Sequence, residues 1–291
     1  MVPIRTREIP ALVLEVRQVT EVKSSIKTSD YVIKKITKIK PRQAWNNAFL
    51  KAAEHTARFF VQGLGDTLLT LTPKIILNAY LDDILAEPAL VEKPKKNAPL
   101  LAIQMSEFER IEEYRRLIRD SFVRHESTFV CLPTEADVMR VAGALKRGIE
   151  DYTFVFHSSL TKKRLLSGWQ TCLEKRHAVV VIGTPQYLAL PRYFDTIIID
   201  EEHSRAWKTR VRPNIDQRIF VEEYAQNMGS ALIFGSPILR PEIHKRIQAG
   251  EILEFGRVTA RTYKELVTEI IDPRIEEKSI KEATGRRTVQ I

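Results

Sequence analysis

The chain has 291 residues, of which 44% are apolar and 29% are charged, a composition typical of a globular protein with a sizeable buried core. It contains no apolar run of the roughly 20 residues that a membrane-spanning helix needs, and its N-terminus lacks the apolar core of a signal peptide. We therefore expect a cytoplasmic protein with no membrane partner. Cys131 and Cys172 are the only cysteines, which excludes a disulfide framework and a four-cysteine zinc site, so each is expected to be a small buried residue.

The net charge is +9, and residues 1–42 contribute ten Lys and Arg against four acidic residues. Segments 11–19 and 31–39 alternate apolar and polar residues as strands do, and we expect a turn over 23–30. Lys34, Lys38 and Lys40 are predicted to share a strand face that could contact DNA phosphates. From charge alone, a DNA-binding surface and a solvated basic face are both open.

From Ala44 the apolar period becomes that of a helix, which Gly63 and Gly65 are expected to end. Its predicted core face consists of Trp45, Phe49, Ala52, Ala53, Thr56, Phe59 and Phe60. The proline- and lysine-containing stretch 85–99 is interpreted as a linker. The sequence thus predicts an N-terminal domain over 1–84, with strands followed by a helix, and a second domain over 100–291.

After the linker, short apolar strands alternate with helices, which predicts an α/β fold with a parallel sheet covered on both faces. The strands are expected at 100–105, 127–133, 152–157, 177–184, 195–200 and 231–237, and the helices at 107–124, 135–148, 162–175 and 215–227. Such sheets bind ligands at the carboxyl ends of their strands. Here those ends read QM, LPT, HSS, GTP, DEEH and GSP.

Several of these strand ends belong to longer motifs: FVCLPTEADV, FHSSLTKKRLLSGW, VVVIGTPQYLALP, TIIIDEEHSRAWK and LIFGSPILRPEIHKRIQAGE. In this order they resemble the first RecA-like lobe, of P-loop-NTPase type, of the primosomal protein N′ (PriA) family of bacterial replication-restart helicases. Upstream, VPIRTREIPALVLEV and AAEHTARFFVQGLGDTLLTLTP look like the DNA-binding region of that family. The resemblance implies single-stranded or forked DNA and replication-restart proteins as partners, and ATP with Mg²⁺ as cofactors of an active member.

The resemblance also assigns roles to individual residues. Asp200 would bind Mg²⁺, Glu201 would activate water, and His203 would link the nucleotide to the DNA-facing loop. The expected DNA contacts are Thr184, Trp207, Lys208, Arg210 and Arg212, with the Trp207 indole stacked on a base. The alternatives are that Asp200 and Glu201 are inherited acids that are solvated or paired to Arg205, that His203 is only hydrogen-bonded, and that Trp207 packs against the lobe.

The sequence departs from the family where phosphates would bind. The segment QMSEFERIEEYRRLI stands in place of a glycine-rich loop, with Arg110 at the lysine position and Ile111 at the threonine position. A phosphate cradle needs glycines for its backbone N–H groups and a hydroxyl for Mg²⁺, and Glu107 and Glu109 would repel phosphate. The GSAT motif of the family reads Gly235-Ser236-Pro237-Ile238 here.

The chain also stops where the second lobe of the family would begin, with its arginine finger and zinc-binding cysteines. We therefore expect no bound zinc and weak or absent ATP binding. The leading hypothesis is a DNA-binding relative of the primosomal helicase that does not hydrolyse ATP. One alternative is a 3′–5′ DNA helicase half completed by a second-lobe chain, with ATP and Mg²⁺ as cofactors. Another is a scaffold for replication proteins that does not bind DNA.

Overall fold

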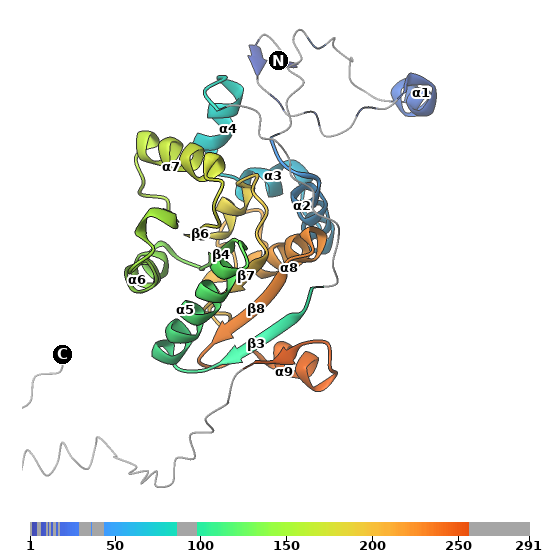
Figure 1. The fold of residues 1–291 in the computed structure, drawn as a ribbon. Helices are drawn as coiled ribbons and strands as arrows, with labels where there is room; N and C mark the ends of the chain where they lie inside the picture. The colour runs from blue at the N-terminus through green and yellow to red at the C-terminus, as the bar shows by residue number, and fades with distance from the viewer. Residues whose placement is uncertain are drawn as a thin grey trace, which may run out of the picture. The chain divides into compact units, whose positions relative to one another are not determined.

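A computed structural model of the chain describes residues 44–85 and 98–255 continuously, and short pieces of the first 43 residues. Its centre is a seven-stranded sheet in the order β5-β6-β4-β7-β8-β3-β9, in which all paired strands are parallel (Figure 1). The strands are β3 (Leu100–Gln104), β4 (Thr128–Cys131), β5 (Thr153–Phe156), β6 (Val180–Gly183), β7 (Thr196–Ile199), β8 (Ala231–Ser236) and β9 (Leu253–Glu254). The predicted α/β class with a parallel sheet is confirmed.

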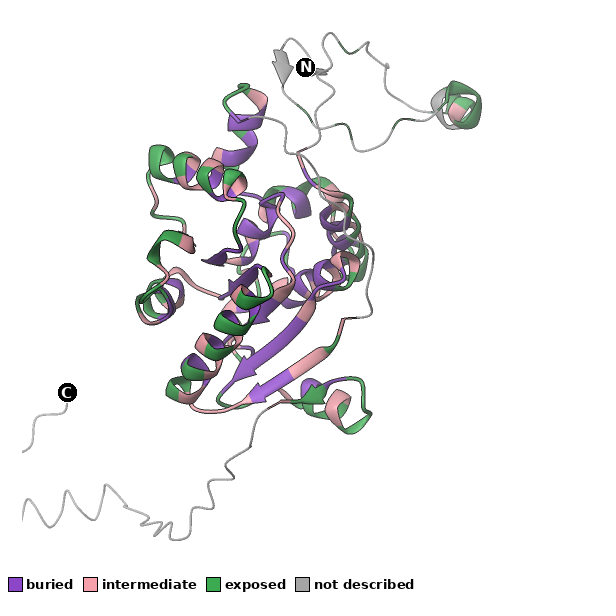
Figure 2. Cartoon of the chain, viewed as in Figure 1, coloured by how far each residue is buried: buried purple, intermediate pink, exposed green. Residues whose placement is uncertain are grey.

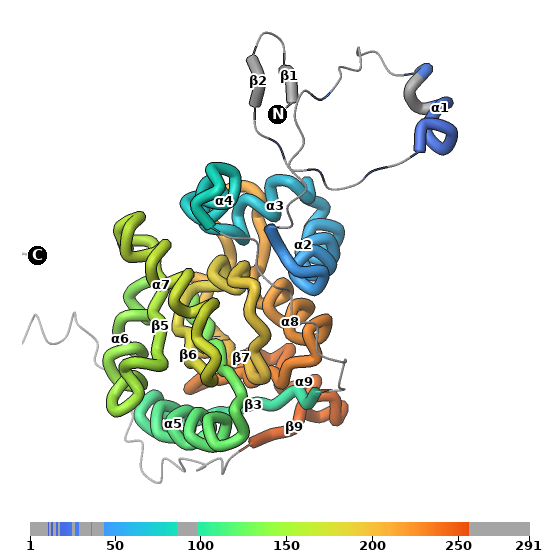
Figure 3. Tube along the Cα trace, turned by 45° about the horizontal axis from the view of Figure 1, so that its top comes forward, coloured from blue at the N-terminus to red at the C-terminus, as the bar shows by residue number. Residues whose placement is uncertain are grey.

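Helices cover both faces of this sheet, as Figures 1 and 3 show from two directions. On one face, Val130, Ile182 and Ile198 pack under α5 (Glu107–Val123) and α6 (Glu135–Leu145). Alternate residues of the same strands, such as Phe129 and Ile197, point to the other face. That face is covered by α7 (Lys162–Glu174), α8 (Gln217–Met228) and α9 (Pro241–Gln248). Because both faces are covered, the central strands are buried throughout (Figure 2).

Local sequence explains where the helices begin. The side chains of Thr134, Thr161 and Asp216 accept hydrogen bonds from the first turns of α6, α7 and α8, as N-cap residues do. Pro241 stands at the first position of α9, where its missing N–H costs nothing. The strands and helices predicted between 100 and 237 are all present, whereas α9 and β9 were not predicted.

Three helices from the first part of the chain pack on the α7/α8 face: α2 (Asn47–Phe59), α3 (Leu64–Thr70) and α4 (Lys74–Leu81). The Phe49 ring of α2 meets Phe220 of α8 edge-on, with ring centroids 5.0 Å apart. The Trp169 Nε1 of α7 donates a hydrogen bond of 3.4 Å to the Tyr80 hydroxyl of α4. These helices therefore share a hydrophobic cluster with the sheet. The linker over 85–99 stays a prediction, because residues 86–97 lie outside the described residues.

The end of α2 differs from the prediction. Trp45, Phe49, Ala52, Ala53 and Thr56 are buried as expected, but Phe59 is 61% exposed. Phe59 is the last residue of α2, and its ring contacts the rings of His55 and Phe60 instead of the core. Gly63 and Gly65 do not end this helix: Gly63 is the N-cap of α3, and Gly65 lies within α3.

The turn predicted over 23–30 is wrong for residues 23–27, because α1 (Val19–Lys27) is a helix. Val19, Val22 and Ile26 recur at helical spacing, which the strand interpretation overlooked. A short hairpin of β1 (Val2–Ile4) and β2 (Arg7–Ile9) precedes it. The strand predicted at 11–19 is wrong at its end, because Val19 begins α1, and nearly all of the strand predicted at 31–39 lies outside the described residues.

Two further findings concern the cysteines and the apolar character of the helices. Cys131 and Cys172 are free and buried, as predicted, and burial raises the pKa of Cys172 to about 12. Among the helices of the described residues, none combines the length and the apolar character needed to cross a membrane.

Candidate functional site

Three segments meet at the carboxyl edge of the sheet: the start of α5 after β3, the DEEH segment after β7, and the Gly235-Ser236 end of β8. They are adjacent because β8 lies between β3 and β7. Backbone hydrogen bonds link the segments, since the Glu202 N–H donates to the Gly235 carbonyl at 3.0 Å and the Met105 N–H to the Ser236 carbonyl at 3.2 Å. This edge holds the acids that the sequence analysis singled out.

Arg110 fills the centre of the site from the first turn of α5, with only 1% of its surface exposed. Its Nε donates to Asp200 Oδ1 at 2.8 Å, its Nη2 to Glu201 Oε1 at 2.6 Å and its Nη1 to the Met105 carbonyl at 2.9 Å. Burial would lower the pKa of the Arg110 guanidinium, but the neighbouring Asp200 and the other groups around it outweigh burial and raise this pKa. The alternative pairing of the acids with Arg205 is therefore wrong, because Arg110 is their partner.

Tyr114, one turn further along α5, completes the contacts of Asp200. Its hydroxyl donates to Asp200 Oδ1 at 2.8 Å, and the side chain is fully buried. Burial, and then the Asp200 carboxylate, raise the pKa of Tyr114 well above its ordinary value, although Arg110 opposes the shift. Tyr114 thus stays a neutral donor. A Cβ added to Gly235 would lie 1.8 Å from the Tyr114 hydroxyl, so the tyrosine fits only because position 235 is glycine.

The second acid, Glu201, is held by two arginines. Its backbone lies in the left-handed region, with φ at 54°, and Arg140 of α6 approaches its Oε1 to 3.7 Å. Arg140 also pairs with Asp137 at 2.9 Å and with Glu107. Four carboxylates, on Asp200, Glu201, Glu107 and Asp137, thus surround two guanidinium groups, on Arg110 and Arg140. The formal charge of this network is negative.

These residues do not fit a nucleotide with Mg²⁺. The Ser106 N–H and hydroxyl at the start of α5 both donate to Glu109 Oε2, at 3.0 and 2.5 Å, so they do not face a phosphate. A triphosphate would also meet a network that is already negative. Asp200 Oδ2 is buried without a hydrogen-bond partner among the described residues, but a cation there would be repelled by the Arg110 guanidinium on the other oxygen of the same carboxylate.

The rest of the DEEH segment is fixed by buried ion pairs that the sequence analysis missed. Glu202 is fully buried and pairs with Arg240, whose backbone N–H also donates to it at 3.2 Å. Arg218 pairs with Asp216 at 2.6 Å and donates to the Glu202 carbonyl. Nothing in the spacing of these charges along the chain pointed to their pairing.

His203 is hydrogen-bonded, since its Nδ1 lies 2.8 Å from Ser236 Oγ. It is also 3.7 Å from Glu201 Oε2, so it connects the ends of β7 and β8. Thr184 is half-buried at the start of the 3-10 turn Pro185–Ala189, and its hydroxyl accepts a hydrogen bond from Gln186 at 3.3 Å. The roles of His203 and Thr184 in binding nucleotide and DNA stay predictions.

Trp207 does not present its ring to solvent. The side chain is fully buried in the core, and its Nε1 donates to the Glu201 carbonyl at 2.9 Å. The predicted base-stacking role is therefore contradicted, because neither face of the indole is free, and the alternative of packing against the lobe is the one observed.

The cations that follow Trp207 are placed differently. Lys208, Arg210 and Arg212 are exposed and form no ion pair with the described residues. Thr209 holds their loop closed, since its N–H donates to the Ile215 carbonyl at 2.9 Å and its hydroxyl donates to the Pro213 carbonyl at 2.6 Å. Lys34, Lys38 and Lys40, the other predicted DNA contacts, lie outside the described residues.

Comparisons of the chain with protein-family models and with curated proteins find no match. The resemblance to the primosomal protein N′ family therefore stays a prediction.

The fit between Gly235 and Tyr114 can be tested by Gly235→Ala. The added Cβ would overlap the Tyr114 hydroxyl, so we expect a loss of about 1–3 kcal/mol in the free energy of unfolding, measured by urea denaturation. Gly143→Ala in α6 is the control: nothing lies within 4 Å of its added Cβ, and this change should be neutral or stabilising. Tyr114→Phe should cost less in the Gly235→Ala background than in the parent. Equal costs in the two backgrounds would contradict the clash.

The Arg110 contacts can be tested by Arg110→Met. This change leaves Asp200 and Glu201 without their guanidinium, and losing one partner of a buried ion pair costs about 3–5 kcal/mol. Arg124→Met, which breaks an exposed pair with Glu126, should cost less than about 1 kcal/mol. Adding Asp200→Asn and Glu201→Gln to Arg110→Met should recover part of the loss. A change below about 1 kcal/mol for Arg110→Met would rule out this role.

Proposed function

We propose that this protein binds single-stranded or forked DNA without hydrolysing ATP, as a relative of the primosomal protein N′ family that acts in replication restart. The observation that most supports the non-hydrolysing part is the Arg110 contact with Asp200 and Glu201. In a nucleotide-hydrolysing site these two acids would serve Mg²⁺ and water. Here the guanidinium of Arg110, a side chain of the same protein, donates hydrogen bonds to both of them.

The DNA-binding part is supported by the loop that carries Lys208, Arg210 and Arg212. Its cations are exposed, and the hydrogen bonds of Thr209 and the buried Trp207 anchor fix the backbone that bears them. Because this backbone is already ordered, it loses little entropy when its cations contact phosphates, and each contact releases counterions. The sequence-independent backbone of DNA is the polyanion that such a loop fits.

The helicase alternative requires a nucleotide to displace Arg110 from two carboxylates, and no feature of the site favours this exchange. In the scaffold alternative, the loop cations are only a solvated surface. The salt dependence of DNA binding separates the scaffold from the DNA-binding protein.

The purified chain should show no ATP hydrolysis above background, with or without single-stranded DNA. The Glu201→Gln variant should give the same background rate, since Glu201 is engaged by Arg110 and Arg140. Release of phosphate by the parent chain that disappears in Glu201→Gln would show that the acid activates water, and the helicase alternative would then replace this proposal.

DNA binding should not need nucleotide and should weaken steeply between about 50 and 200 mM salt. The triple variant Lys208→Gln, Arg210→Gln, Arg212→Gln should lower the affinity for labelled oligonucleotides, measured by fluorescence anisotropy, and reduce the salt dependence by up to about three phosphate contacts. The matched control Lys51→Gln, Arg58→Gln, Lys74→Gln removes the same charge from exposed positions on α2 and α4. Salt-independent binding, or equal effects of the two triple variants, would favour the scaffold.

A further inference from the structure

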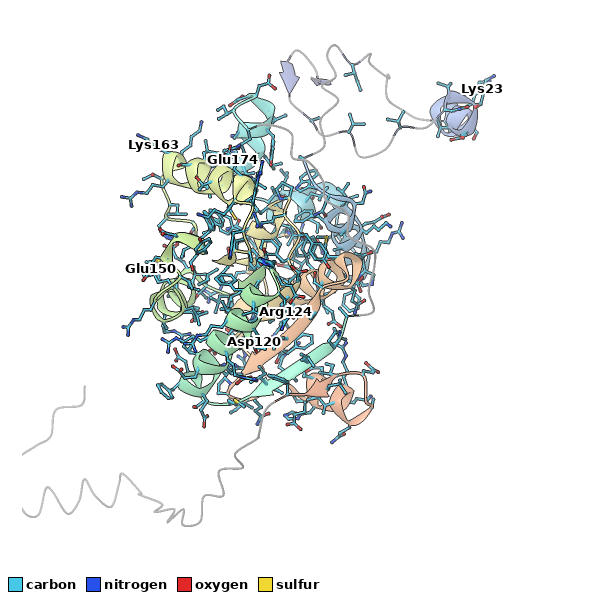
Figure 4. All side chains as sticks on the ribbon, in the orientation of Figure 1. Lys23, Asp120, Arg124, Glu150, Lys163 and Glu174 are labelled. Atoms are coloured by element: carbon cyan, nitrogen blue, oxygen red, sulfur yellow. The ribbon has the colours of Figure 1, made fainter. Side chains whose placement is uncertain are left out.

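A second cationic feature lies away from the DEEH segment, on the face covered by α5 and α6. An open hollow of about 270 Å³ is formed where the middle of α5 meets the end of α6. It is lined by Arg115, Ile118, Arg119, Leu145, Arg147 and Ile149. Figure 4 labels Asp120, which follows Arg119 on α5. It also labels Glu150, which follows Ile149 at the start of the 3-10 turn Glu150–Tyr152. We call this feature the arginine hollow.

Three arginines and three apolar residues thus line one small hollow. Ile118 and Leu145 are each 2% exposed and form the floor. Arg115 is fixed in place, because its Nη2 donates to the Ala144 carbonyl at 2.9 Å and its Nη1 pairs with Glu112. Arg119 and Arg147 are exposed and form no ion pair with the described residues. The lining contains no acidic side chain among these described residues.

Arg119 and Arg147 bring two positive charges to the hollow that no acid of the described residues pairs with, whereas Arg115 is paired with Glu112. Arg115 and Arg119 are four residues apart on α5, and like charges at that spacing destabilise a helix. Arg119 and Arg147 line the same hollow as Arg115. Guanidinium groups bind phosphate oxygens in bidentate geometry and stack on planar rings, and an apolar floor accommodates a sugar or a base.

We propose that the arginine hollow binds a phosphate ester of about one nucleotide in size. The shared chemistry is a phosphate group next to a sugar and a base, and its source is either a free mononucleotide or one nucleotide of a DNA strand. The hollow is distinct from the DEEH site, because Arg119 lies nine residues beyond Arg110, roughly 14 Å along the axis of α5. The proposal does not depend on the loop that carries Lys208, Arg210 and Arg212.

The test compares two double variants of the full chain that lose the same charge. Arg119→Gln with Arg147→Gln removes the two unpaired cations of the hollow. Arg164→Gln with Arg176→Gln is the control, because both arginines are exposed and lie outside the hollow. Binding of AMP is measured by isothermal titration calorimetry and binding of a labelled 12-mer of thymidylate by anisotropy, both at about 50 mM salt, where screening is modest.

We expect the hollow variant to weaken binding of at least one probe about tenfold, since it loses charge-assisted hydrogen bonds, while the control changes it less than about threefold. Loss of AMP binding identifies a free mononucleotide as the ligand, and loss confined to the 12-mer identifies a DNA strand. The melting temperature of the hollow variant should match that of the control. The proposal would be overturned by equal effects of the two variants or by a lack of saturable binding of either probe. It would also be overturned by a lower melting temperature with unchanged binding, which would show that Arg147 only stabilises the end of α6.

Discussion

A carboxylate buried in a protein needs a positive partner, and in this chain Arg110 supplies it for Asp200. Removing a carboxylate from water costs several kcal/mol unless a charge and hydrogen bonds replace the solvent. Asp200 is 1% exposed, and Arg110 and Tyr114 provide that replacement from two successive turns of α5. In a nucleotide-dependent protein the positive charge would arrive with the ligand. Here it is covalently attached, so this edge of the sheet is assembled without any ligand.

A chain of direct contacts connects Arg110 to the exposed loop that carries Lys208, Arg210 and Arg212. Arg110 fixes Glu201, the Glu201 carbonyl accepts a hydrogen bond from Trp207, and Trp207 immediately precedes the loop that carries the exposed cations. Arg218 and Arg240 hold the intervening Glu202 from the opposite side. Each of these contacts is made by groups of the protein itself.

The central part of the fold could be predicted from the sequence because short runs of β-branched residues between amphipathic helices have few other solutions. The pairing of Arg110 with Asp200 could not, since 90 residues separate them and their contact depends on β8 lying between β3 and β7. Tyr114 gave a weak signal, four residues after Arg110 on the same helical face. Trp207 was misjudged because a tryptophan between basic residues looks the same in sequence whether its ring is exposed or buried.

The helix α5 carries arginines in two different surroundings. Arg110, Tyr114 and Ile118 follow its buried face, where Arg110 reaches carboxylates from another segment. Arg115 and Arg119 are offset by one position and emerge towards the end of α6, where Arg147 adds a third cation. An arginine with carboxylates within reach gains little from an external anion, because binding one would mean giving up those contacts. Arg119 and Arg147 have no such partner among the described residues, so an external phosphate would add interactions there without breaking any.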